Sequence, residues 1–77
     1  KSLADETRLK ILTFLIDGER CVCEIFPHVK KSQSTVSIHL NNLESNGIVN
    51  SRREGKYIHY RIVDNKIIEL IRLLEKK

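Results

Sequence analysis

The chain has 77 residues and a mass of 9.0 kDa, enough for one small domain and too little to enclose a deep substrate pocket. It is 40% hydrophobic and 31% charged, a composition typical of a globular protein, and its net charge of +4 favours a polyanionic partner. No apolar run reaches the roughly 18–20 residues needed to span a bilayer. The first residues, KSLADETR, carry acidic side chains where a signal peptide has its apolar core, so we expect no signal peptide in this stretch.

The first predicted element is a helix over about residues 6–16, where apolar residues such as Leu9 and Leu12 recur at helical spacing. We expect Asp5 to cap its N-terminus, because a carboxylate there accepts hydrogen bonds from free backbone amides. Gly18 is expected to end the helix in a left-handed conformation.

Residues 22–29 predict a short second helix, because their apolar side chains follow an i, i+3, i+4, i+7 pattern. Pro27 lacks a backbone donor and crowds the preceding turn. We therefore expect this helix to be short, kinked or shifted.

Cys21 and Cys23 stand two residues apart at the start of this helix. A disulfide between them would close a tiny, strained loop and stabilise nothing beyond it. The sequence therefore predicts free or metal-binding thiols in a reducing cytoplasm rather than a secreted, disulfide-bonded scaffold.

The third helix has Ser32 as its expected N-cap and residues 46–47, Asn-Gly, as its C-terminal stop. Val36, Leu40 and Leu43 form one apolar stripe. A generic solvated helix face carries Lys and Glu more often than short polar side chains. The other faces of this helix are polar and almost uncharged, with Gln33, Ser34, Ser37, Ile38, Asn41, Asn42 and Ser45.

The period then changes to two, which predicts a hairpin of residues 48–53 and 57–62 around a Glu54–Gly55 turn. In the register we expect, Arg53 pairs with Lys56. This register separates an apolar face from a polar and aromatic one: Ile58, Tyr60 and Ile62 against Tyr57, His59 and Arg61.

A last helix over about residues 65–76 begins at Asp64, which can cap it. Its apolar residues cover more than half of its circumference, more than one core-facing stripe requires. The excess predicts a homodimer interface. These residues are Ile67, Ile68, Leu70, Ile71, Leu73 and Leu74.

The predicted order, α-α-α-β-β-α, is that of a winged helix-turn-helix: one mainly α domain over residues 1–77 with a β-hairpin. In this fold the third helix enters the major groove of double-stranded DNA. The charge map agrees, because residues 30–61 hold six basic and two acidic side chains, a net charge equal to that of the whole chain.

Four stretches resemble the ArsR/SmtB family of metal-responsive repressors: LADETRLKIL, ERCVCEI, SQSTVSIHLNNLESNGIV and RREGKYIHYRI. Together they cover the chain from about Leu3 to Ile62. The resemblance implies a homodimeric bacterial or archaeal repressor. Such a protein binds an inverted-repeat operator when metal-free and leaves it when a metal or metalloid binds.

The resemblance also implies which residues meet DNA. The third helix would contact base edges, where Ile38 could meet a thymine methyl group, and the hairpin would contact phosphates. The candidate DNA-binding residues are Gln33, Ser34, Thr35, Ser37, Ile38, His39, Asn41, Arg52, Arg53, Lys56 and Arg61.

Cys21 and Cys23 match the family's cysteine motif, and thiolates suit soft effector ions such as As(III), Cd²⁺, Pb²⁺ or Zn²⁺. Folding itself is expected to need no ion. A helix N-terminus is expected to lower the thiol pKa. Phe26 stands where arsenic-sensing members carry a third cysteine. Cadmium- and lead-sensing members take further donors from an N-terminal arm, and the resemblance leaves open whether such an arm precedes this sequence, which begins without Met.

Other interpretations of these residues remain open. Both cysteines could be small buried side chains, which would make the chain a DNA-binding regulator without a metal site. The fold could also serve as a protein-interaction module. An enzyme is not expected, because the sequence offers Cys23 and His28 but no third group or oxyanion loop.

Overall fold

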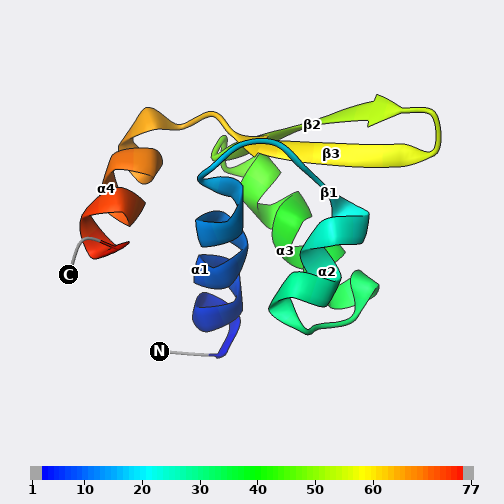
Figure 1. The fold of residues 1–77 in the computed structure, drawn as a ribbon, viewed down its shortest axis with the longest axis horizontal. Coiled ribbons are helices and arrows are strands. Elements are labelled where there is room, and N and C mark those ends of the chain that lie inside the picture. Colours follow the sequence, from blue (N-terminus) through cyan, green and yellow to red (C-terminus); the bar gives the residue numbers. More distant parts are fainter. Residues whose placement is uncertain (1–2, 76–77) are drawn as a thin grey trace.

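The computed structural model describes residues 3–75, and its elements follow the winged helix-turn-helix order predicted from the sequence (Figure 1). No helix in this range is long and apolar enough to cross a membrane. The elements are α1 (Leu3–Leu15), β1 (Arg20–Cys21), α2 (Val22–Val29), α3 (Gln33–Ser45), β2 (Val49–Glu54), β3 (Tyr57–Ile62) and α4 (Asn65–Glu75).

The sheet has three antiparallel strands in the order β1-β3-β2. Helices α1, α2 and α3 lie on one side of it, and the β2–β3 hairpin of residues 49–62, here called the wing, extends past them (Figure 1). The strand β1 is absent from the predicted order. It is only two residues long, and pairing with β3, where Arg20 lies opposite Tyr60, is what makes it a strand.

The predicted hairpin register is wrong by two residues. Glu54 pairs with Tyr57, so the turn is formed by residues 55–56 rather than by Glu54 and Gly55. Gly55 has a φ of 64° at the first central position, a conformation that glycine adopts at little cost. A shift of two preserves the face of every side chain, and Tyr60 and Ile62 are buried as predicted.

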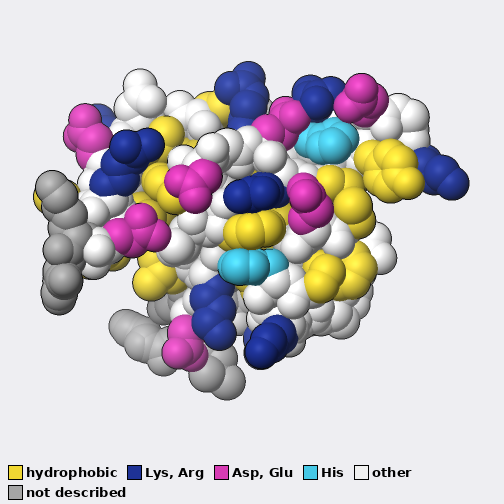
Figure 2. All heavy atoms as spheres, in the orientation of Figure 1, with side chains coloured by type: hydrophobic (Ala, Val, Ile, Leu, Met, Phe, Trp, Pro, Cys, Tyr) yellow, Lys and Arg dark blue, Asp and Glu magenta, His cyan; other side chains and the backbone are white. Residues whose placement is uncertain are grey.

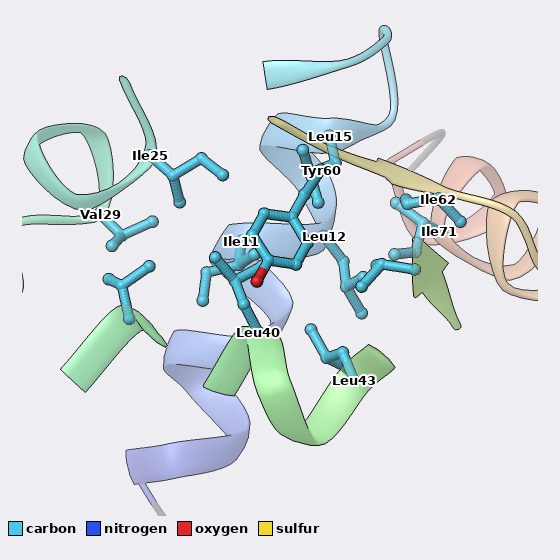
Figure 3. Close-up of a cluster of buried hydrophobic side chains, with 12 residues drawn as sticks. Ile11, Leu12, Leu15, Ile25, Val29, Leu40, Leu43, Tyr60, Ile62 and Ile71 are labelled. Atoms are coloured by element: carbon cyan, nitrogen blue, oxygen red, sulfur yellow. The ribbon is translucent and has the colours of Figure 1, made fainter. Parts of the chain in front are cut away.

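The core brings together side chains from all four helices and from the sheet (Figure 3). The ring of Tyr60 lies at its centre, between residues of α1 and α3. The close-up labels Ile11, Leu12, Leu15, Ile25, Val29, Leu40, Leu43, Tyr60, Ile62 and Ile71. The same core therefore holds α3 and the base of the wing in place.

The predicted start of the first helix is wrong. Helix α1 begins at Leu3, so Asp5 lies within the helix rather than at its N-cap. Gly18 does have a positive φ, 144°, but this is far from the left-handed helical value of about 57°. The turn after α1 therefore requires glycine, although in a different conformation from the one expected.

The other helix boundaries match the prediction closely. Helix α2 is short, eight residues long, and is not shifted, with Pro27 inside it. Helix α4 is capped by Asp64, whose Oδ1 accepts a hydrogen bond from the Lys66 amide at 3.0 Å. It ends at Glu75 in the described range, and the predicted last residue, 76, lies outside that range.

Candidate nucleic-acid interface

Helix α3 buries one stripe and presents its polar side to solvent. Val36, Leu40 and Leu43 are fully buried, while Gln33 and Asn41 are exposed. Its N-terminus is fixed by Ser32, whose Oγ accepts a hydrogen bond from the Thr35 amide at 3.2 Å. The helix is therefore held rigidly, with short hydrogen-bonding side chains on its accessible face.

The candidate base-contacting residues differ in accessibility. Gln33, Ser34 and Asn41 are exposed, and Ser37 is half-buried. Ile38 is 68% exposed, which is unusual for an aliphatic side chain and fits contact with an apolar group such as a thymine methyl. Thr35 and His39 are half-buried, and the Thr35 hydroxyl accepts a hydrogen bond from Ser32 Oγ at 3.0 Å.

The wing carries four exposed cations, Arg52, Arg53, Lys56 and Arg61. Figure 2 shows basic, acidic and histidine side chains next to one another over the hairpin. The side chains of Arg53 and Lys56 form no hydrogen bond or ion pair with any other residue of the range 3–75. These two cations are available to an external anion.

Arg52 is bound by two carboxylates. Its Nε and Nη2 donate to both oxygens of Glu19 at 2.8 and 2.7 Å, and its Nη1 donates to Glu54 at 3.2 Å. The hydrogen bond from Arg52 holds the pKa of Glu19 below its usual value of 4.5. Sequence inspection misses this partnership, because the two residues are 33 positions apart.

The two thiols form the start of α2. The Cys21 sulfur is the N-cap and accepts a hydrogen bond from the Cys23 amide at 3.3 Å. Glu24 completes a capping box, its Oε1 accepting from the Cys21 amide at 2.9 Å. Cys21 is buried, Cys23 is exposed, and their sulfurs are 2.6 Å apart.

The expected lowering of the thiol pKa is wrong for Cys23. Its pKa is raised, chiefly by the hydrogen bond to the Cys21 sulfur and further by burial and nearby negative charge. Proximity of a second thiol outweighs the helix N-terminus here.

The donor set suits a soft ion but is incomplete within residues 3–75. Two bonds of about 2.3 Å to one tetrahedral ion place the sulfurs about 3.8 Å apart, so these thiols would have to separate on binding. No group of three or more His, Cys, Asp or Glu side chains in the described range could hold a metal ion. Cys21 and Cys23 can supply two donors, and a third is not among the described residues.

His28 is engaged elsewhere. Its ring stacks on Phe14, with centroids 3.8 Å apart and planes inclined by 10°, and Arg20 lies over the same Phe14 ring at 4.3 Å. This stack joins α1, β1 and α2. Nothing in the spacing of these three residues indicates it.

A hollow of about 470 Å³ lies between the two thiols and the polar side of α3. On one side lies the start of α2, and on the other lie α3 and the wing. Tyr57 is 51% exposed and borders this hollow. Its lining residues include Cys21, Cys23, Gln33, Ser37, Asn41 and Lys56.

Helix α4 has an exposed apolar surface. Ile71 is buried in the core, but Leu70, Leu73 and Leu74 are 53%, 65% and 52% exposed. Leu9 of α1 is also exposed, at 45%. The leucines of α4 lie in a protein whose other exposed side chains are largely polar, which marks them as a contact surface.

The sequence matches known regulators along nearly its whole length. A family model described as "Bacterial regulatory protein, arsR family" matches residues 5–51. An uncharacterized HTH-type transcriptional regulator of Methanocaldococcus jannaschii is 46% identical over 77 residues, covering 99% of this chain and 86% of that protein.

Two relatives belong to resistance systems. The cadmium resistance regulator CadC of Listeria innocua is 43% identical over 74 residues, covering 95% of this chain and 62% of that protein. The arsenical resistance operon repressor of Escherichia coli is 44% identical over 63 residues, covering 80% and 54% respectively. The chain therefore spans little more than half the length of these two relatives.

Solved structures share the fold. Reduced HlyU from Vibrio cholerae superposes with a TM-score of 0.90 at 36% identity, covering 96% of this chain and 78% of that chain. The homodimeric winged helix-turn-helix DNA-binding domain of Mb0332 from Mycobacterium bovis has a TM-score of 0.82 at 38% identity, covering 95% and 68%.

Proposed function

The chain belongs to the arsR family of bacterial regulatory proteins, and from this premise we propose that it is a homodimeric repressor whose DNA binding is controlled by a soft ion at Cys21 and Cys23. The family consists of DNA-binding transcriptional regulators, not enzymes. The repressor role, the dimer and the ion are the proposal. We place the protein in the cytoplasm, where its DNA partner and reduced thiols would be found.

The dimer is supported by the exposed leucines of α4 and by Leu9 of α1. Burying a leucine stabilises an interface by about 1.5–3 kcal/mol, and a two-fold axis uses each patch twice. The related Mb0332 domain is described as homodimeric. A two-fold dimer would present two copies of α3 to successive major-groove segments of an inverted repeat.

DNA recognition is assigned to the exposed polar side of α3 and to the wing. Hydrogen-bonding side chains of α3 read base edges, Ile38 contacts a thymine methyl, and the wing cations contact phosphates. The residues in this proposal are Gln33, Ser34, Thr35, Ser37, Ile38, His39, Asn41, Arg53, Lys56 and Arg61, whereas the guanidinium of Arg52 already binds Glu19 and Glu54.

The effector is proposed to be As(III), Cd²⁺, Pb²⁺ or Zn²⁺ bound by both thiolates, with a third donor from outside residues 3–75. Relatives that regulate cadmium and arsenical resistance support this class of ion. The exposed Cys23 can meet an incoming ion first, and the buried Cys21 would then exchange its capping role for coordination.

One observation carries the link between ion and DNA: the thiols border the same hollow as Gln33, Ser37 and Lys56. Separating the two sulfurs changes the wall of this hollow directly, without transmission through the dimer interface. DNA binding and ion binding would then oppose each other, each weakening the other by the same factor.

The test uses a duplex isolated from a random-sequence pool by selection with the wild-type protein. We expect at least one of cadmium chloride, sodium arsenite, lead nitrate and zinc chloride to release the wild type from this duplex, measured by fluorescence anisotropy. The Cys21→Ser, Cys23→Ser variant should bind the duplex as tightly as the wild type, because serine also caps helices well, but should not be released.

Two results would contradict this proposal. Release of the double variant by any of these ions would place the sensor elsewhere. Failure of all four ions to release the wild type would refute the sensing role of the thiols and leave DNA binding standing.

A further inference from the structure

The adjacent arginines of β2 lie on opposite faces of the wing, because successive residues of a strand alternate. Val49 is buried against the helices and Ser51 lies on the same face, its hydroxyl donating to Glu44 of α3 at 2.9 Å. Arg53 belongs to this face by the same alternation. Arg52 belongs to the other.

Arg52 meets an acidic environment on that outer face. The bidentate contact with Glu19 and the contact with Glu54 engage three of its nitrogens. His59 also lies within 3.5 Å of Glu54. Three of the five N–H donors of Arg52 are therefore occupied, and two carboxylates offset its charge, which weakens its attraction for a phosphate.

The ion pair ties the wing to the segment before β1. Glu19 immediately precedes Arg20, the first residue of β1, and in the sheet Cys21 lies opposite His59, which in turn lies opposite Arg52. β1 is only two residues long, so few ladder hydrogen bonds hold it against the wing. The bidentate contact adds a second attachment at the same edge.

We propose that Arg52 is a positioning residue rather than a phosphate ligand, and that Glu19 is its functional partner: together they hold the wing at the angle at which Arg53 and Lys56 reach DNA. This inference rests on the proposed role of the wing in DNA binding. It assigns to Glu19 a part in DNA recognition although Glu19 carries the same charge as DNA.

The charge of Glu19 makes its removal diagnostic. If Glu19 merely competes with phosphate for Arg52, then Glu19→Gln tightens duplex binding. It also increases the magnitude of the slope of log K against log salt by about one, because one more counterion is released. If it positions the wing, the same substitution weakens binding about two- to fivefold and leaves the salt dependence unchanged.

The experiment measures anisotropy of the selected duplex across a salt series for Glu19→Gln, Arg52→Gln and Arg53→Gln. We expect the first two to weaken binding to a similar extent at every salt concentration. Arg53→Gln, the matched control, should instead reduce the slope of log K against log salt by about one. The exchanged pair, Glu19→Arg with Arg52→Glu, should recover most of the wild-type affinity.

A DNA-free readout keeps the inference testable if no duplex is bound, which would count against the proposed function alone. In the free protein, Glu19→Gln and Arg52→Gln should shift the same amide resonances of Cys21 and His59 on the neighbouring strands, and Arg53→Gln should not. Three results would overturn the inference: different chemical-shift patterns for Glu19→Gln and Arg52→Gln, tighter duplex binding by Glu19→Gln, or a reduced slope of log K against log salt for Arg52→Gln.

Discussion

Helices α3 and α4 are both half-buried, yet their exposed sides differ in chemistry. On α3 the exposed side chains include Gln33, Ser34 and Asn41, whereas α4 exposes Leu70 and Leu73. Both helices contribute to the same core. The two helices therefore differ in the kind of partner that their exposed sides can bind.

This difference assigns a partner to each surface. Short polar side chains make directional hydrogen bonds and lose little in water, so α3 can stay exposed until it meets base edges. Exposed leucines make no directional contacts and gain free energy when any apolar surface covers them. Because no other element of this small domain covers them within residues 3–75, we infer that the leucines of α4 pack against a second copy of the chain.

Leu73→Glu is expected to have the largest effect, because a carboxylate in an apolar interface must be desolvated without a partner. We expect the dimer dissociation constant to rise at least about 100-fold, since each two-fold interface loses two leucines. Sedimentation equilibrium measures the change, with Lys66→Glu as the control that adds the same acidic residue near the start of α4. An unchanged dimer would assign α4 another role.

Gln33→Ala with Ser37→Ala tests the opposite surface. Each lost base contact is expected to cost about 1–3 kcal/mol on the selected duplex and little on a scrambled one. Ser45→Ala, at the far end of α3, serves as the control. Equal losses on both duplexes would mean that these residues position the protein without reading sequence.

Ser32→Ala removes the N-cap of α3, together with the hydrogen bonds between Ser32 Oγ and the hydroxyls of Ser34 and Thr35. We expect a loss of about 1 kcal/mol in the free energy of unfolding, because the Thr35 amide loses its acceptor. In a domain of this size this lowers Tm by about 4–8 °C. Thermal denaturation followed by circular dichroism measures it, and a Tm equal to that of the wild type would show that the cap contributes nothing.

The smallest expected effect is on pH dependence. The pKa of Glu19 is lower in the folded protein than its usual 4.5, so its contribution to stability is complete above that value and is lost as the pH falls through the folded pKa. The melting temperature of Glu19→Gln should therefore decline less between pH 5 and 3 than that of the wild type. Parallel declines would show that the pair is not formed in solution.

Local features were predictable where one segment contains its own signal. Ser32 capped α3 as expected, and the spacing of Val36, Leu40 and Leu43 identified its buried side. The faces of the wing were also predictable, because alternation survives a register error of two residues.

Two kinds of feature could not be predicted from the sequence: contacts between distant residues, and local geometry that residue spacing does not determine. The strand β1 exists only through its pairing with β3, and Glu19 and Arg52 meet across 33 positions. The direction of the Cys23 pKa depended on which way the Cys21 sulfur points, which spacing does not reveal. The turn depended on Gly55 taking the first central position rather than the second.

The most direct test of the whole account is an NMR titration of the protein with the selected duplex. We predict that amide shifts concentrate in residues 33–41 of α3 and at residues 53–56 of the wing, with the leucines of α4 unaffected. Shifts concentrated on Leu70, Leu73 and Leu74, with residues 33–41 unchanged, would contradict the assignment of α3 and the wing to DNA.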